Sequence, residues 1–321
     1  MNRRSRMVRA ALAFGVLAVL ALLLVRLADH IYAWRVEQRY AEWEASVERD
    51  ADGVRTGFEP FKAGEGAVGI LFVHGFAGSP SLYRYFVPYF AEHGFACRAI
   101  RLPGFGETVD RAAEVRRADW VRAVRSAALE MRAEHETVWI VAHSLGGTVA
   151  LRALQADAAL ADGLVLLAPL LEVSDARSPI LEPEEWFAVG EFLVAESDVL
   201  ESIFPIDAHD PRVREKEERD LFIPLDLYSE LFALLDDLDA GPADVDIPVM
   251  MVLSKRDKIV DSDAAEAWFT ALTNEANRLL VVEPAGHVLP LDTGWDSLLT
   301  EIKDYVVNHA RNRDTQTGRR Y

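Results

Sequence analysis

The chain has 321 residues, 50% of them hydrophobic and 27% charged, and this balance excludes a disordered polypeptide. Its formal net charge of −18 argues against a surface that attracts nucleic acid. A single cysteine, Cys97, excludes an intrachain disulfide framework and lies in an apolar run typical of a small buried hydrophobe. Beyond an N-terminal targeting segment, about 285 residues remain, enough for one α/β domain with an insertion or for two small domains.

Four arginines precede an uncharged apolar segment at residues 10–25, and Arg26 follows it. Sixteen helical residues reach about 24 Å, short of a bilayer core of about 30 Å. The long stems of Arg9 and Arg26 extend that reach because their charged ends can lie at the two interfaces. Residues 1–35 are therefore predicted to form an uncleaved signal anchor and to attach the chain to a membrane.

Two alternatives to the anchor are a cleaved signal peptide and a buried or peripheral helix. Cleavage after Ala28 would leave Arg26 at the −3 position, where a small residue is required. The basic N-terminus is expected to stay in the cytoplasm, so the rest of the chain would face the periplasm or the cell exterior. Cleavage of the signal would instead give a secreted protein.

Residues 36–56 are rich in charged and helix-forming side chains, and aromatic residues recur on a loose stripe at Trp34, Tyr40 and Trp43. This pattern predicts a juxtamembrane helix or linker between the anchor and the folded body. The segment would act as a stalk or as a docking helix.

From residue 66 onward, continuous apolar strands alternate with amphipathic helices. The expected strands lie at 67–75, 95–104, 137–144, 163–170, 247–257 and 277–287 (the last with its following loop), and the expected helices at 81–94, 118–135, 146–155, 262–272 and 295–310. This alternation is typical of an α/β fold with a parallel sheet covered on both faces. The core is expected at residues 57–171 and 246–312, with a disordered tail at 313–321.

The segment 172–245 breaks the alternation and, with about 20 acidic and about 5 basic residues, accounts for most of the net charge of −18. It shows short helical patterns and no convincing strand. An insertion between two sheet strands at the carboxyl edge covers the crevice where ligands bind. The segment is therefore predicted to be an acidic helical cap.

The stretch "IVAHSLGG" at residues 140–147 takes the chain from a buried strand into a helix through Ser144. Ala142 and Gly146 flank the serine at −2 and +2, the small-x-Ser-x-small pattern of a nucleophile elbow. Small residues let strand and helix approach, and the helix N-terminus favours a developing anion. The simpler alternative is a serine that only caps the helix.

A serine hydroxyl needs a base to take its proton, and the base needs an acid to orient it. Asp257 ends the strand "VMMVLSKRD", and His287 follows the last apolar strand in "VVEPAGH". The order serine, aspartate, histidine is the one that this type of fold uses. Alternatives are a turn aspartate, an exposed loop histidine, and Asp261 or Asp263, which are expected to cap the next helix.

The loop "HGFAGSP" after the first strong strand can present a backbone N–H to an oxyanion, and we assign this role to Phe76 together with Leu145. His74 and His143 lie in the same tight loops and are expected to support loop geometry. The sequence shows no metal-ligand spacing, no Walker phosphate loop and no GxGxxG, so no metal is expected.

Four motifs, "LFVHGFAGSPSLYRYFVPYFAEHGFACRAIRLPGFGET", "AHSLGG", "SKRDKIV" and "PAGHVLPLD", together resemble the bacterial carboxylesterase and monoacylglycerol lipase group of the α/β-hydrolase superfamily, a group of serine aminopeptidase S33 type. The similarity covers about residues 57–309. It implies hydrolysis of carboxylic esters through an acyl-serine intermediate without a cofactor. By this resemblance Ser144, Asp257 and His287 match the triad, and Phe76 and Leu145 match the oxyanion hole.

Apolar cap residues either line an acyl pocket or form the small core of the cap itself. They are Trp186, Phe187, Phe192, Leu193 and Phe204.

The expected substrate is a small-molecule or lipid ester. A serine aminopeptidase or amidase, an acyltransferase, and a non-catalytic membrane-anchored binding protein stay open as alternatives. Acyl chain length and oligomeric state have no signal in the sequence.

Overall fold

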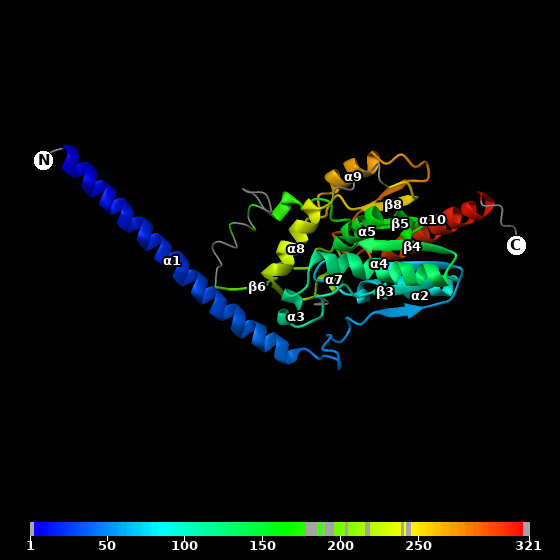
Figure 1. Ribbon diagram of the computed structural model, residues 1–321, viewed down its shortest axis with the longest axis horizontal. Helices are drawn as coiled ribbons and strands as arrows, with labels where there is room; N and C mark the ends of the chain where they lie inside the picture. Colours follow the sequence, from blue (N-terminus) through cyan, green and yellow to red (C-terminus); the bar gives the residue numbers. More distant parts are fainter. Residues whose placement is uncertain are drawn as a thin grey trace.

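The computed structural model describes residues 3–177, 185, 187, 189, 196–202, 205–215, 219–238, 241 and 245–316. A seven-stranded sheet forms the centre, in the order β1-β3-β2-β4-β5-β8-β9 (Figure 1). Every neighbouring pair is parallel except β1 and β3. The strands are β1 Phe61–Ala63, β2 Val68–Val73, β3 Ala96–Ile100, β4 Thr137–His143, β5 Gly163–Leu167, β8 Val249–Leu253 and β9 Arg278–Val281.

Helices cover both faces of the sheet, because its central strands are apolar on both sides. Helices α4 (Arg117–Glu134) and α5 (Leu145–Ala156) pack together on one face, and α2 (Phe86–Glu92) packs with α10 (Trp295–Gln316). Two short helices, α3 (Val109–Ala113) and α9 (Ser262–Thr270), lie beside this core. The architecture confirms the predicted α/β fold, and α10 extends past the expected boundary at residue 312.

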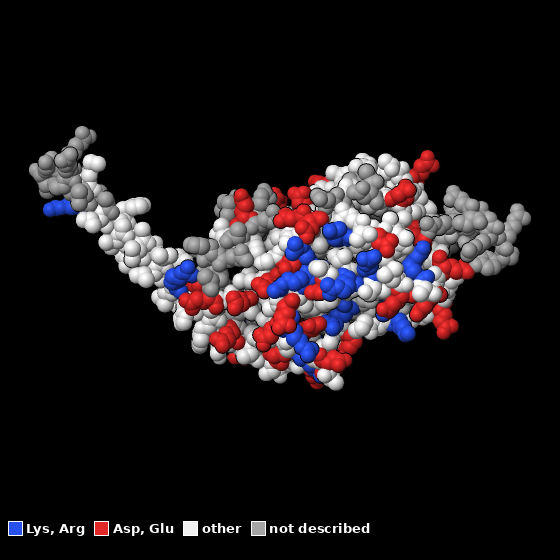
Figure 2. Space-filling model, in the orientation of Figure 1, with Lys and Arg blue, Asp and Glu red and all other residues white. Residues whose placement is uncertain are grey.

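The N-terminal helix α1 runs unbroken from Arg3 to Ser46 and projects from the body as a long rod (Figure 1). Sequence analysis divided this region at residue 35, but helix-forming residues continue through that point and leave no break. The part Leu12–Ser46 is long and apolar enough to cross a membrane, with a mean hydropathy of 2.3 in its most apolar stretch. Figure 2 shows the free length of α1 almost without charged side chains.

The second half of α1 packs on the body. Its buried Val36 and half-buried Tyr40 and Trp43 meet Phe222 and Val109 in a small apolar cluster separate from the main core. Of the predicted aromatic stripe, Tyr40 and Trp43 form a docking face, whereas Trp34 is exposed. The docking-helix alternative therefore describes this segment better than a free stalk.

The region 172–245 contains helices but also a strand pair, so the expectation of no strand was wrong. Strands β6 (Val199–Glu201) and β7 (Phe222–Pro224) form an antiparallel ribbon, followed directly by α8 (Leu225–Asp236). A short helix, α7 (Pro211–Arg214), lies between the two strands in the sequence. Each strand has only three residues, too few for an alternating pattern to be visible in the sequence.

Candidate active site

Three side chains that are far apart in the sequence meet at the carboxyl edge of the sheet. Ser144 lies between β4 and α5, Asp257 follows β8, and His287 follows β9. The Nε2 atom of His287 is 2.9 Å from the hydroxyl oxygen of Ser144, and its Nδ1 atom is 2.8 Å from Oδ2 of Asp257. The structure thus joins the three predicted residues in one hydrogen-bonded chain.

The turn that carries Ser144 is strained. Its φ of 52° is positive, a conformation that a residue with a side chain rarely adopts. Hydrogen bonds hold it, because the Ser144 N–H donates to the Leu167 carbonyl and the Leu170 N–H donates to the Ser144 carbonyl. A Cβ atom on Gly146 would lie 2.6 Å from backbone oxygens of the neighbouring strand, so the first glycine after the serine is required by close packing.

The carboxylate of Asp257 is buried and charged. Burial raises its pKa, but His287 and the backbone N–H groups of Ile259 and Val260 favour the ionised form more strongly, so its pKa is lowered overall. Because a carboxylate only accepts hydrogen bonds, the Nδ1 of His287 must carry the proton that it shares with Asp257. This tautomer leaves Nε2 free to accept the proton of the Ser144 hydroxyl.

The predicted oxyanion donors lie next to this chain. Within the described residues, the backbone N–H groups of Phe76 and Leu145 have no hydrogen-bond partner. Buried N–H groups without a partner are rare, since each costs free energy that an incoming oxygen can recover. The Phe76 ring packs against Tyr228 at 5.0 Å and Phe105 at 5.3 Å, and this packing fixes the loop.

Both neighbouring histidines hold loops and stay neutral. Burial lowers the pKa of His74 to about 4, and its Nε2 accepts the N–H of Leu102 while its Nδ1 donates to the Gly75 carbonyl. Burial and the nearby His287 lower the pKa of His143 to about 3. The Nε2 of His143 lies 2.9 Å from the carbonyl oxygen of His287.

Sequence reasoning missed a carboxylate that fixes the histidine loop. Asp292 is fully buried and accepts four backbone N–H groups, from His209, Asp210, Gly286 and Thr293, at 2.6–2.7 Å. It therefore ties the segment before α7 to the residue next to His287. The motif "PAGHVLPLD" contains it, and an aspartate inside an apolar run was the signal available.

A second missed carboxylate, Asp207, joins both partner loops of the triad. Its backbone carbonyl accepts the N–H of His287, and its side chain accepts the N–H of Lys258. Gly286 must lack a side chain here, because a Cβ atom would lie 2.6 Å from the Asp207 carbonyl oxygen. No local pattern in the acidic segment distinguished this aspartate from its neighbours.

The alternatives to Asp257 have other roles. Asp261 caps α9 by accepting the N–H groups of Asp263 and Ala264, and the Asp263 carboxylate pairs with Lys255 at 2.7 Å. Within the described residues, no group of three or more histidine, cysteine, aspartate or glutamate side chains is placed to hold a metal ion.

A cavity of about 360 Å³ opens over Ser144 and His287. Most of its lining is apolar and includes Phe76, Leu82, Leu170, Ile223, Phe232 and Ile259. Phe187 packs against two lining rings, Tyr228 at 6.0 Å and Phe232 at 5.0 Å. The other predicted pocket residues, Trp186, Phe192, Leu193 and Phe204, lie outside the described residues.

A mostly parallel sheet with serine, aspartate and histidine in this chain order at its carboxyl edge defines the α/β-hydrolase fold. The family model described as "Serine aminopeptidase, S33" matches residues 66–294, and the chain belongs to that family. It is 23% identical over 257 residues to a thermostable monoacylglycerol lipase of Bacillus sp. (strain H-257), covering 80% of this chain and 97% of the lipase.

Two further comparisons agree with this assignment. The chain is 22% identical over 249 residues to a carboxylesterase of Bacillus subtilis (strain 168), covering 77% of this chain and 94% of the esterase. A solved structure of a metagenome-derived lipolytic enzyme superposes with a TM-score of 0.68 at 22% identity, covering 79% of this chain and 99% of that one. The resemblance expected from the motifs is confirmed.

Proposed function

We propose that the chain is a serine hydrolase that cleaves carboxylic esters through an acyl-enzyme. One observation carries the proposal: the hydroxyl of Ser144, the ring of His287 and the carboxylate of Asp257 form a continuous hydrogen-bonded chain beside an apolar cavity. The lipase and carboxylesterase relatives support ester cleavage. An apolar lining favours an acyl chain over a peptide.

In the proposed mechanism, His287 takes the proton of Ser144 as the serine oxygen attacks the ester carbonyl. Asp257 holds the ring tautomer and stabilises the imidazolium that forms. The N–H groups of Phe76 and Leu145 bind the oxyanion. His287 then protonates the leaving alcohol, and water that it activates releases the carboxylic acid from Ser144.

The family name raises the alternative of an aminopeptidase, which needs a carboxylate to bind the substrate amine. Among the described residues that line the cavity, Asp207 is the one acidic side chain, and it already accepts backbone N–H groups. Two arginines, Arg84 and Arg219, line the same cavity and would repel an ammonium group. The lining therefore favours an ester.

The test is hydrolysis of p-nitrophenyl esters from acetyl to palmitoyl by the full chain in detergent. We expect Ser144→Ala to lower kcat/KM at least about 1,000-fold. Ser202→Ala is the matched control, because Ser202 lines the same cavity without contacting His287, and it should keep most of the activity. No ester hydrolysis above the Ser144→Ala level would refute the esterase. Peptide amides and added acceptor alcohols then test the aminopeptidase and the acyltransferase.

We further propose that α1 anchors the chain in a membrane with its N-terminus in the cytoplasm and the body outside. The apolar length of α1, the arginines before it and the unbroken helix through Ala28 support an anchor over a cleaved signal. Arg26 also pairs with Asp29 at 3.6 Å across the point where cleavage would fall.

A further inference from the structure

The β6–β7 ribbon separates α1 from the cavity, with one face toward each. On β7, Phe222 packs against Tyr40 of α1 at 5.6 Å, while the next residue, Ile223, lines the cavity. On β6, Glu201 lies opposite Phe222 and pairs with Arg39 of α1 at 2.7 Å, while the next residue, Ser202, lines the cavity. Since successive strand residues point to opposite faces, α1 supports the outer side of the cavity wall.

The contacts between α1 and the body begin immediately after its apolar stretch. The buried carboxylate of Asp29 accepts the backbone N–H of Glu196 at 3.2 Å, and the side chain of Glu196 meets His30 at 2.8 Å. Asp29 is three residues beyond Arg26, the charge that closes the apolar segment. No flexible linker therefore separates the apolar segment from the body.

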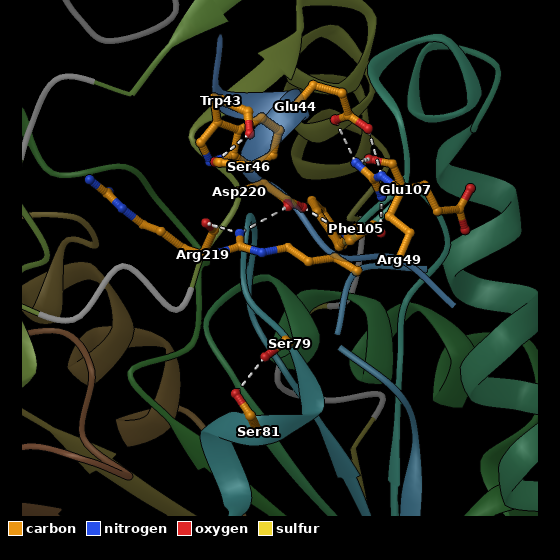
Figure 3. Close-up of polar contacts among 12 residues, drawn as sticks. Trp43, Glu44, Ser46, Arg49, Ser79, Ser81, Phe105, Glu107, Arg219 and Asp220 are labelled. Carbon is orange, nitrogen blue, oxygen red and sulfur yellow. Dashed lines mark hydrogen bonds and ion pairs between the residues drawn. The ribbon is translucent and has the colours of Figure 1, made fainter. Parts of the chain in front are cut away.

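The far end of α1 is fixed as well (Figure 3). Glu44 binds Arg49 through two hydrogen bonds of 2.7 Å, and Arg49 donates to the carbonyl of Gly106. The N–H of Gly106 donates to Asp220, whose own N–H donates to the Ala77 carbonyl next to Phe76. The part of α1 from Asp29 to Ser46 is thus held at both of its ends and joined to the loop that carries the proposed oxyanion donor.

These contacts also fix the distance between the cavity wall and the end of the apolar segment. Asp29 and Arg39 are ten residues apart on a continuous helix, which corresponds to about 15 Å. The chain contacts α1 at both points, through Glu196 just before β6 and through Glu201 at the end of β6. Arg26, which closes the apolar segment, is 13 residues before Arg39, so the cavity wall lies within about 20 Å, measured along α1, of the place where that segment ends.

We infer that α1 is a rigid spacer that holds the cavity at the surface of the bilayer that α1 crosses, so that the cavity takes its lipid ester from that same bilayer. The inference rests on the proposed ester hydrolysis and on the proposed anchor. An acyl chain that leaves the bilayer exposes apolar surface to water, which costs free energy. An apolar cavity close to the headgroups shortens the path through water between the bilayer and Ser144. The exposed side chains of Leu27, Ile31 and Trp34 lie on α1 at this level, as expected for a membrane interface.

The test changes the distance between the cavity and the bilayer surface and leaves the folded body intact. Twenty Gly/Ser residues are inserted between Leu27 and Ala28, which lengthens the connection by about 25 Å on average. The matched control carries the same twenty residues after Tyr321. Both proteins are reconstituted in phosphatidylcholine vesicles that contain monooleoylglycerol, and hydrolysis of water-soluble p-nitrophenyl butyrate is measured in parallel.

We expect the insertion at residue 27 to lower hydrolysis of monooleoylglycerol at least about 5-fold and to leave hydrolysis of p-nitrophenyl butyrate unchanged. Unchanged rates on both esters would overturn the spacer. If both rates fell together, a second experiment with the parent chain decides. It compares the rate of hydrolysis of monooleoylglycerol placed in the vesicles that carry the protein with the rate for monooleoylglycerol placed in separate, protein-free vesicles. A rate at least about 10-fold higher in its own vesicles supports the inference, and equal initial rates overturn it. Absence of Ser144-dependent hydrolysis of p-nitrophenyl butyrate would instead refute the proposed function.

Discussion

Carboxylates that accept backbone N–H groups lie near the triad, and two of them, Asp292 and Asp220, are buried. Each of three aspartates accepts hydrogen bonds from backbone groups in segments distant in sequence. Asp207 and Asp220 belong to the region 172–245, and Asp292 binds the N–H of His209 in that region. A carboxylate can accept several N–H groups at once, and such bonds are stronger than bonds between neutral groups. At the scale of single residues, these aspartates hold the loops that carry the proposed chemistry.

We predict that Asp292→Asn lowers the free energy of unfolding by about 2–4 kcal/mol. All four hydrogen bonds of Asp292 come from N–H donors, two on each oxygen. An amide would turn its NH₂ group toward two of these donors and leave them without an acceptor. Urea unfolding measures the change, and Asp296→Asn, an exposed neighbour at the start of α10, is the matched control. Equal stability of the two variants would contradict the assigned role of Asp292.

The same substitution is expected to lower kcat for ester hydrolysis at least about 10-fold, because Asp292 fixes Gly286 and so the ring position of His287. KM should change less, since Asp292 does not line the cavity. A loss of stability with unchanged kcat would show that the loop position does not depend on this carboxylate.

The neutral His74 predicts a loss of stability in acid. Its pKa of about 4 in the folded protein lies below the value of about 6.5 in the unfolded chain. Between these values the unfolded chain binds more protons, so stability is complete above about pH 6.5 and falls as the pH falls. At pH 5 the loss from this residue is about 2 kcal/mol.

The measurement compares urea unfolding at pH 8 and pH 5 for the parent and for His74→Gln. The drop in unfolding free energy should be about 2 kcal/mol smaller in the variant, because glutamine does not titrate. His93→Gln is the matched control, since the His93 ring is exposed, and it should keep the parental drop. A parental drop in His74→Gln would contradict the neutral, buried state of His74.

Serine, aspartate and histidine could be placed from the sequence because the carboxyl ends of parallel strands meet at one edge of the sheet. Ser144, Asp257 and His287 each follow a strand directly, so the order of the strands brings them together. Asp207, Asp220 and Asp292 had no comparable signal. Apart from Thr293, which follows Asp292 directly, their partners are backbone groups 6 to 114 residues away, and only the folded chain defines them.

At the scale of elements, the β6–β7 ribbon has two faces with different tasks, and neighbouring residues test them. Phe222→Ala removes an aromatic ring between Tyr40 and Trp43 and should free α1 from the body. We expect tryptic cleavage at Arg35 or Arg39 to become at least about 10-fold faster. Ile223→Ala should leave this cleavage rate unchanged.

Ile223→Ala is instead expected to enlarge the cavity and to move the preferred p-nitrophenyl ester toward a longer acyl chain. Hydrolysis rates across the acetyl-to-palmitoyl series measure this shift. If Phe222→Ala changed the preferred chain length while Ile223→Ala released α1, the assignment of the two faces would be wrong.

The main strands and helices were predictable because each is long and strongly patterned, as β4 and α4 are. Strands β1, β6 and β7 were not, since each has three residues and depends on a partner elsewhere in the chain. The continuity of α1 was missed for a related reason. Its polar second half reads as a linker until Phe222 and Val109 cover its aromatic stripe.

At the scale of the whole molecule, charge is divided along the chain. Arg3, Arg4, Arg6 and Arg9 lie before the apolar segment, whereas the region 172–245 carries about 20 acidic residues. Arginines near a membrane-spanning helix stay on the cytoplasmic side, while acidic residues contribute little to orientation. This charge arrangement supports the proposed orientation, in which the body with its cavity lies on the outer side.

The last prediction concerns retention of α1 in the membrane. We expect the protein to stay in the membrane pellet after alkaline carbonate extraction and to keep its apolar segment, because a helix buried in a bilayer is not removed by high pH. Trypsin cuts after Arg9 and Arg26, so mass spectrometry of the extracted protein should detect the peptide of residues 10–26. A protein in the soluble fraction that lacks this peptide would show a cleaved signal.

Orientation is measured in the same preparation with a reporter fused after Tyr321. Alkaline phosphatase, which is active only outside the cytoplasm, should be active, and green fluorescent protein exported through the same route should be dark. Changing the four N-terminal arginines to glutamine should lower the phosphatase activity, since the charge difference across the helix is then lost. Phosphatase activity that is absent in the parent would place the body in the cytoplasm, and the bilayer leaflet proposed to supply the substrate would change with it.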